Sequence, residues 1–140
     1  MKKFLYIPLF AFSMLLALPS QAANIERTVQ TLCDYAKTNN RSAIRKRLKE
    51  ARINLKAVYD AIQCGAGKGF EGGSLLKTAT FFGAEHVAKF LIIRLGEKGL
   101  KNLEDPNFAQ WGHNLIASGK TPKPAAVKNI IEKYREKTAS

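Results

Sequence analysis

Apolar side chains recur at every third or fourth position along most of the chain after its first twenty residues. This spacing places them on one face of an α-helix, and no stretch alternates in the way that a strand does. We therefore expect an all-α fold that ends in an amphipathic helix. The periodic positions are Ile25, Val29, Leu32, Cys33 and Ala36; Ile44, Leu48 and Ala51; Leu55, Val58, Tyr59 and Ile62; Leu75, Leu76, Ala79 and Phe82; Val87, Leu91 and Leu95; Phe108, Trp111, Leu115 and Ile116; and Val127, Ile130, Ile131 and Tyr134.

Polar and glycine residues mark the expected ends of several helices. Asn54 and Ser74 are placed so that their side-chain oxygens cap helix starts, and Gly83 is placed to end the short helix that follows Ser74. Thr121 and Pro122 predict the start of the last helix, with the proline at its first position.

Residues 1–22 have the pattern of a signal peptide. Lys2 and Lys3 precede an apolar run over residues 4–18, which is shorter than the roughly 20 residues of a spanning helix. Cleavage after Ala22 would leave residues 23–140 as a single helical domain, periplasmic or secreted, with no further spanning segment. An uncleaved N-terminal anchor is the alternative.

The chain contains two cysteines, Cys33 and Cys64. Exported proteins fold under oxidising conditions, so we predict a disulfide between them. Closing a loop of about 30 residues would contribute on the order of 3–4 kcal/mol. Two buried thiols are the alternative.

A weak internal repeat predicts two stacked, antiparallel helix pairs. In each copy a short helix, a turn at Asn or Gly and a second helix follow one another; chance similarity between amphipathic helices is the alternative. The matched positions are Thr31, Leu32, Ala36, Asn40, Ile44, Lys46 and Leu48 with Ser74, Leu75, Ala79, Gly83, Val87, Lys89 and Leu91.

The second copy, SLLKTATFFGAEHVAKFLI, resembles an ankyrin repeat. The matching positions are Ser74, Leu76, Ala79, Gly83, Val87 and Leu91. Leu75 and Lys77 depart from the proline and histidine of that family. The resemblance implies an ankyrin-like helical array in which Lys77 and Phe81 leave the core and face a partner. Phe81 packed under the neighbouring glycine-rich loop is the alternative.

The wider pattern also resembles an uncharacterised family of small exported bacterial proteins, a domain of unknown function. Cys33 and Cys64 carry the resemblance, together with the leader and the start of the second copy. It implies a location and a fold, and no activity.

The segment CGAGKGFEGGS, residues 64–74, contains a G-x-G-x-x-G match from Gly67 to Gly72. A dinucleotide-binding loop needs a strand before it, whereas a helix that ends near Gly65 is expected here. Lys68 is not followed by Ser or Thr, which excludes a P-loop. We therefore expect a flexible loop without a cofactor, with Phe70 exposed as a candidate for partner binding.

No constellation for catalysis or metal binding emerges. Neither His86 nor His113 has a second ligand three or four residues away. Glu71, Glu104 and Asp105 are possible site carboxylates, but the sequence alone does not join any pair of them into a site. A disulfide would remove the thiol nucleophile. We expect no enzyme, no catalytic residue, no metal and no cofactor.

Charge is the strongest remaining signal, with a formal net charge of +12. Seven cations and one acid lie in residues 41–56. Arg41, Arg45, Lys49 and Arg52 fall within a helical arc of about 80°, beside the apolar arc that Ile44, Leu48 and Ala51 form. This basic stripe is either an anion-binding surface or a solvated face that maintains solubility.

Two functions fit these features. The first is a non-enzymatic periplasmic adaptor that binds an envelope protein through Phe70, Lys77 and Phe81. The alternative is a basic protein that binds anionic envelope surfaces, such as lipopolysaccharide, acidic glycan or nucleic acid, through the basic stripe. Nothing in the sequence resembles a nucleic-acid-binding fold, and aromatic residues do not alternate with the arginines, so we expect no sequence-specific nucleic-acid binding.

Overall fold

The computed structural model describes residues 20–139 of the chain, and their side chains from residue 24 onward. Helices dominate it, and one disulfide joins Cys33 to Cys64, as the sequence predicts. The elements are α1 (Ser20–Lys37), α2 (Arg41–Glu50), α3 (Leu55–Val58), the single 3-10 turn η1 (Tyr59–Ala61), β1 (Gln63–Cys64), β2 (Gly73–Ser74), α4 (Leu75–Phe81), α5 (Glu85–Leu103), α6 (Phe108–Ser118) and α7 (Pro124–Thr138). The predicted leader lies outside the described residues except for its last three, which begin α1.

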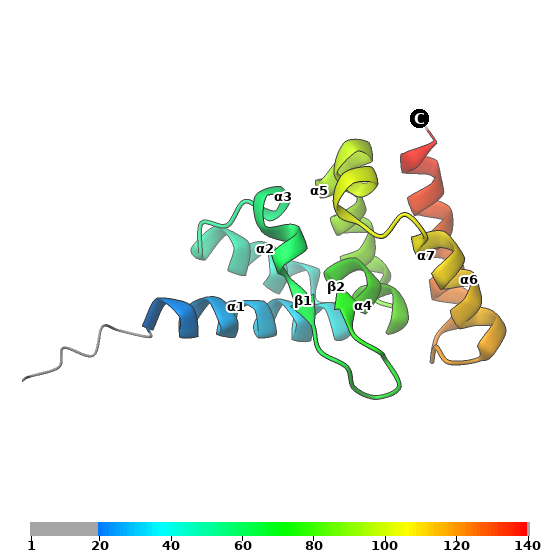
Figure 1. The fold of residues 1–140 in the computed structure, drawn as a ribbon, viewed down its shortest axis with the longest axis horizontal. Helices are drawn as coiled ribbons and strands as arrows, with labels where there is room; N and C mark the ends of the chain where they lie inside the picture. Colours follow the sequence, from blue (N-terminus) through cyan, green and yellow to red (C-terminus); the bar gives the residue numbers. More distant parts are fainter. Residues whose placement is uncertain (1–19, 140) are drawn as a thin grey trace, which may run out of the picture.

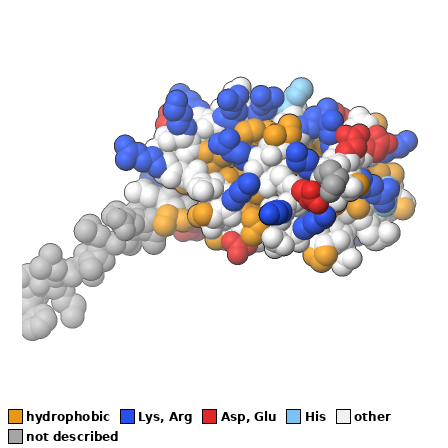
Figure 2. All heavy atoms as spheres, turned by 90° about the horizontal axis from the view of Figure 1, so that it is seen from above, with side chains coloured by type: hydrophobic (Ala, Val, Ile, Leu, Met, Phe, Trp, Pro, Cys, Tyr) orange, Lys and Arg blue, Asp and Glu red, His pale blue; other side chains and the backbone are white. Residues whose placement is uncertain are grey.

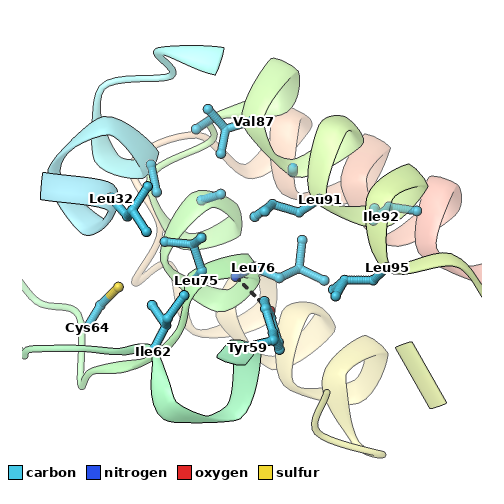
Figure 3. Packing of buried hydrophobic residues seen from close by; sticks show 14 of the residues in the cluster. Leu32, Tyr59, Ile62, Cys64, Leu75, Leu76, Val87, Leu91, Ile92 and Leu95 are labelled. Carbon is cyan, nitrogen blue, oxygen red and sulfur yellow. Dashed lines mark hydrogen bonds between the residues drawn. The ribbon is translucent and has the colours of Figure 1, made fainter. Parts of the chain in front are cut away.

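The helices pack around one cluster of buried side chains. α1 lies along one edge of the molecule with α2 and α3 over it, and α5, α6 and α7 form the opposite end (Figure 1). α4 lies between the two groups, and its Leu75 and Leu76 are fully buried. Around them Leu32 of α1, Tyr59 of η1 and Leu91 of α5 meet in the core (Figure 3).

The α1–α2 and α4–α5 connections are the same turn. Asn39 and Gly83 each adopt a left-handed conformation, with φ of 58° and 68°. In both turns the backbone nitrogens bond back to the preceding helix in the same order: Asn39 to Ala36 and Asn40 to Tyr35, Gly83 to Thr80 and Ala84 to Ala79. The repeat inferred from sequence pairs Asn40 with Gly83, so that alignment is wrong by one position at the turn.

The predicted caps of two helices are confirmed, and that of the last helix is wrong. Ser74 accepts a hydrogen bond from the Lys77 nitrogen at 3.1 Å, and Asn54 caps α3 in the same way. α7, however, begins at Pro124. The Thr121 hydroxyl instead donates to the Phe81 carbonyl at 2.9 Å, so it secures the α6–α7 connection to α4.

The predicted helix over Leu55–Ile62 breaks into two single turns. At Val58 the backbone leaves the α-helical path, with φ of −121°, and at Ile62 it is extended. Cys64 has to reach both the disulfide and a strand partner, Gly73, and a helix continuing to Gly65 would prevent this. The chain therefore contains a two-stranded ribbon, β1–β2, that the hydrophobic pattern does not predict.

The glycine-rich segment is an ordered β-hairpin. Beyond the β1–β2 pairs, Gly67 and Phe70 exchange two backbone hydrogen bonds of 2.9 Å. The two residues between them, Lys68 and Gly69, have φ of 51° and 84°, as the centre of a type I′ turn requires. Phe70 is 3% exposed. The expectation of a flexible loop with an exposed Phe70 is thus wrong, because the buried ring anchors the hairpin to the core.

Candidate anion-binding site

The basic stripe of α2 forms as predicted on its outer side. Ile44 and Leu48 are buried against the core, whereas Arg41, Arg45 and Lys49 are exposed on the neighbouring arc. Ala51 differs from the prediction, since it ends the helix and is exposed. The i, i+4 spacing therefore separates the helix into one apolar and one cationic face.

Arg52 continues the stripe past the end of α2 in a left-handed conformation, with φ of 53°. Its nitrogen bonds to the Lys49 carbonyl and the Ile53 nitrogen to the Leu48 carbonyl, which closes the helix. Glycine is the usual residue at such a position, and a side chain there costs on the order of 1 kcal/mol. Arg52 thus adds a guanidinium group to the basic stripe in spite of this conformational cost.

Three of the four predicted anion-binding residues line one surface hollow of about 580 Å³. Lys46 and, from a different helix, Arg94 of α5 also line it, so five cations surround the hollow. No acidic residue belongs to its lining. The full lining is Ser42, Arg45, Lys46, Leu48, Lys49, Arg52, Ile53 and Arg94. Arg41, one helical turn before Arg45, does not line this basic hollow.

The cations of the basic hollow are mostly unneutralised. Within residues 20–139, no ion pair forms at Arg45, Lys49 or Arg52. Lys46 has an acidic neighbour, Glu50, at 3.9 Å on an exposed surface, where such a pair contributes little. Figure 2 shows Lys and Arg side chains along one edge and across the rest of this face, with apolar side chains exposed between them. The hollow therefore presents a concentrated positive charge to solvent.

Arg47 belongs to the same basic segment and is used internally. It is half-buried between α2 and α1, and its Nη2 donates a 3.0 Å hydrogen bond to Thr28. The Arg47 side chain points away from the basic stripe because position 47 lies on the side of α2 that faces α1. It holds the two helices together and does not contribute to the hollow.

The predicted partner-binding residues come together, but not as an exposed surface. Phe81 is 1% exposed and packs on Phe70 with ring centroids 5.1 Å apart, so the alternative of packing under the glycine-rich segment is the correct one. Phe82, predicted to be core, is half-buried. The Lys77 ammonium lies 2.7 Å from Asp105 and 5.0 Å from the ring centre of Trp111. None of the three offers a free side chain to a partner.

A smaller pocket of about 230 Å³ lies between the hairpin and α6. Phe70, Phe81 and Leu115 form its apolar floor, and the half-buried Trp111 forms one wall. The indole nitrogen of Trp111 donates to Glu71 of the hairpin at 3.1 Å. No sequence pattern predicts this pairing, because the two residues are brought together only by the packing of α6 on α4.

A buried polar network secures the start of α4. The Tyr59 hydroxyl donates to the Glu104 carboxylate at 2.5 Å. It also accepts from the Leu76 nitrogen at 3.1 Å (Figure 3). Glu104 also accepts hydrogen bonds from Ser74 at 2.9 Å and from the Asp105 nitrogen at 3.0 Å. Burial, and secondly the Glu104 charge, raise the pKa of Tyr59 well above its ordinary value. These bonds satisfy both partners and link η1, α4 and the end of α5.

The remaining candidate groups do not gather. Asp105 pairs with Lys77; the hydrogen bond from Lys77, and then that from the Asn107 nitrogen, lower its pKa. His86 lies on α5 and His113 on α6. Within residues 20–139, no three His, Cys, Asp or Glu side chains are placed to hold a metal ion.

None of the helices in the described part of the chain combines the length and the apolar character needed to cross a membrane.

A family of proteins of unknown function, DUF3718, matches residues 32–102, which make up half of the chain. The chain belongs to this family. No curated protein and no solved structure matches it. The DUF3718 segment extends from α1 almost to the end of α5 and contains both cysteines and the β-hairpin. All eight residues that line the basic hollow lie within it.

Proposed function

We propose that this DUF3718 protein is an exported, non-enzymatic protein that binds anionic envelope surfaces through the basic hollow. One observation carries the proposal. Arg45, Lys49 and Arg52 of one segment and Arg94 of another helix surround the same open hollow, and no acid is part of its lining.

Several fixed cations around one hollow are suited to ligands with several negative charges. Arginine presents a rigid fork of donors that matches phosphate and carboxylate oxygens, and lysine adds a mobile point charge. Each cation near an anionic surface contributes about 1 kcal/mol, which salt screens. Phosphorylated lipid headgroups and acidic glycans have this chemistry.

The disulfide supports an extracytoplasmic location. Cys33 and Cys64 are joined with a Cα–Cα distance of 5.6 Å, and such bonds persist in oxidising compartments. The predicted leader agrees with this location. Anionic polymers and lipids of the cell envelope are therefore the ligands that we propose.

An adaptor role is the second candidate, and it now depends on a different feature. Phe70 and Phe81 are buried, so these two predicted contact residues are not exposed to a partner. The pocket beside Trp111 is the remaining support, since half-buried tryptophans are frequent anchors in protein interfaces.

Vesicle binding with matched variants tests the proposal. The hollow variant combines Arg45→Ala, Lys49→Ala and Arg52→Gly; the glycine keeps the left-handed turn. The control removes three exposed cations elsewhere, through Lys98→Ala, Lys128→Ala and Arg135→Ala. Both variants have the same net charge.

Phosphatidylglycerol vesicles are expected to bind the wild type in a salt-sensitive manner, and zwitterionic vesicles are not. The hollow variant should lose about 100-fold in affinity, from about 1 kcal/mol for each of three cations, and the control much less. Equal losses in the two variants would show that net charge alone drives binding, and would refute a role for the hollow.

A further inference from the structure

A second hollow, of about 440 Å³, lies between α1 and the α2–α3 region and is almost entirely apolar. Its lining is Asn24, Ile25, Thr28, Val29, Leu32, Ala51, Ile53, Val58, Ala61 and Ile62. Two of these side chains, Ile25 and Val58, are 66% and 36% exposed. We call this second hollow the apolar groove. Its size falls in the range of roughly 300–1,000 Å³ that ligand pockets occupy.

The polar atoms at the edge of the apolar groove already have partners. The Thr28 hydroxyl donates to the Asn24 carbonyl at 2.9 Å and accepts from Arg47 at 3.0 Å. Because this hydroxyl already has a donor and an acceptor, a ligand in the groove does not have to supply a polar group to it. The groove is therefore suited to a flexible hydrocarbon.

The apolar groove and the basic hollow meet at one residue. Ile53 lines both of them. Its neighbour Arg52 lines only the basic hollow, and Ala51 lines only the groove. The left-handed turn at Arg52 thus separates a cationic site from an apolar one over a few residues. The connection between α2 and α3, which contains this turn, lies above the first half of α1 (Figure 1).

We propose that these two hollows form one amphipathic site for a phosphorylated lipid: an acyl chain lies in the apolar groove and the phosphate headgroup in the basic hollow. The inference rests on the anion-binding function proposed above. Charge complementarity selects this occupant, because the groove adjoins an opening with five cations and no acid in its lining. A helix from a protein partner would need no such arrangement of charge.

Soluble short-chain lipids test the site without a membrane. The probes are dibutyryl and dihexanoyl phosphatidylglycerol below their micelle concentrations, and glycerol phosphate as a headgroup without chains. Their binding to the full chain is measured by calorimetry, with the intact mass recorded to define the N-terminus. The two lipids differ by two methylenes in each chain, and each buried methylene is worth about fourfold in affinity.

A groove variant and a matched control separate this site from general hydrophobic binding. Ile25→Asn with Val58→Asn changes two exposed side chains of the groove, so we expect the variant to fold, and its circular dichroism spectrum checks this. Ile93→Asn is the control, because Ile93 is 70% exposed and lies outside both hollows. The hollow variant described above supplies the test of headgroup binding.

The wild type and the Ile93 control should bind the dihexanoyl lipid at least about tenfold more tightly than the dibutyryl lipid. The groove variant should lose this difference and retain glycerol phosphate binding. Chain-length independence in the wild type, with salt-sensitive headgroup binding retained, would overturn the lipid site and leave the anion-binding function standing. No headgroup binding at all would refute the proposed function itself.

Two other outcomes would also overturn the lipid site. One is chain-dependent binding of short-chain phosphatidylcholine that the hollow variant does not weaken, which would make the groove independent of the basic hollow. The other is a retained Met1, with residues 1–19 cross-linking to Ile25 or Val58, which would identify the leader as the occupant of the groove.

Discussion

The side-chain oxygen of Asn39 accepts hydrogen bonds from the backbone nitrogens of His86 and Val87, at distances of 2.9 and 3.2 Å. α5 begins at Glu85, and the residue before it, Ala84, has no side chain that could accept such bonds. The turn of the first helix pair therefore caps the long helix of the second. Asn39 also holds the left-handed conformation of its own turn, so one residue serves both helix pairs.

Replacing Asn39 should separate these two roles. Asn39→Gly keeps the left-handed turn and loses the cap, so the free energy of unfolding should fall by about 1 kcal/mol. Asn39→Ala loses the cap and also strains the turn, at a further cost of about 1 kcal/mol or more. Urea denaturation gives both values. Asn102→Ala, at an exposed position near the other end of α5, is the control, and a glycine variant as stable as the wild type would show that the cap contributes nothing.

Tyr59→Phe should destabilise the fold by about 1–3 kcal/mol. The substitution removes the donor to the buried Glu104 carboxylate and the acceptor for the Leu76 nitrogen, and neither group can turn to water. Guanidinium unfolding measures the change. Tyr35→Phe is the matched control because Tyr35 is half-buried and packs at the edge of the core. Equal stability of the two variants would contradict the importance of the network.

The same tyrosine predicts a loss of stability at alkaline pH. The pKa of Tyr59 is raised in the folded state, so above pH about 10 the unfolded chain ionises while the folded chain keeps its proton. Stability is then complete below pH about 10 and falls as the pH rises through the folded pKa. Tyr59→Phe should flatten this decline. Tyrosinate absorbance should show Tyr59 ionising only with unfolding; ionisation at its ordinary pKa in the folded chain would contradict the prediction.

At acidic pH, Asp105 should cause the free energy of unfolding to fall as the pH is lowered. The hydrogen bond from Lys77 leads the causes that lower its folded pKa, so its contribution is present above the ordinary value of about 4 and is lost as the pH falls through the folded pKa. Asp105→Asn should make stability less dependent on pH below about 4. Unfolding midpoints between pH 5 and pH 2 (about the range of this titration) measure the slope. An unchanged slope would mean that Asp105 titrates normally.

Removal of the disulfide should have the largest effect on stability. Cys33→Ala with Cys64→Ala opens a loop with a sequence separation of 31 residues, and the loss should be on the order of 3–4 kcal/mol. Both sulfur atoms are buried, so reduction of the wild type should require partial unfolding. Thermal unfolding of the variant and of the reduced wild type should agree. An unchanged unfolding midpoint in the double-alanine variant would show that the cross-link does not stabilise the fold.

Local pattern determined the helices, many of their ends and the partners of the disulfide. Spacing of three and four residues is a property of neighbours in the chain, so Ile44 and Leu48 predict the buried side of α2 without knowledge of the rest. Ser74 likewise caps α4 through a bond to a residue three positions away. The pairing of Cys33 with Cys64 needed no geometry, because the chain has no other cysteine.

The tertiary structure alone decided which distant residues meet. Tyr59 and Glu104 are 45 residues apart, and only the packing of η1 against the end of α5 joins them. In the same way Arg94 completes a hollow that α2 begins, and Phe70 is buried because Phe81 lies beneath the hairpin. Side-chain burial and charge clustering depend on contacts between elements, and a helical period specifies the face of a helix but not the neighbour that the face meets.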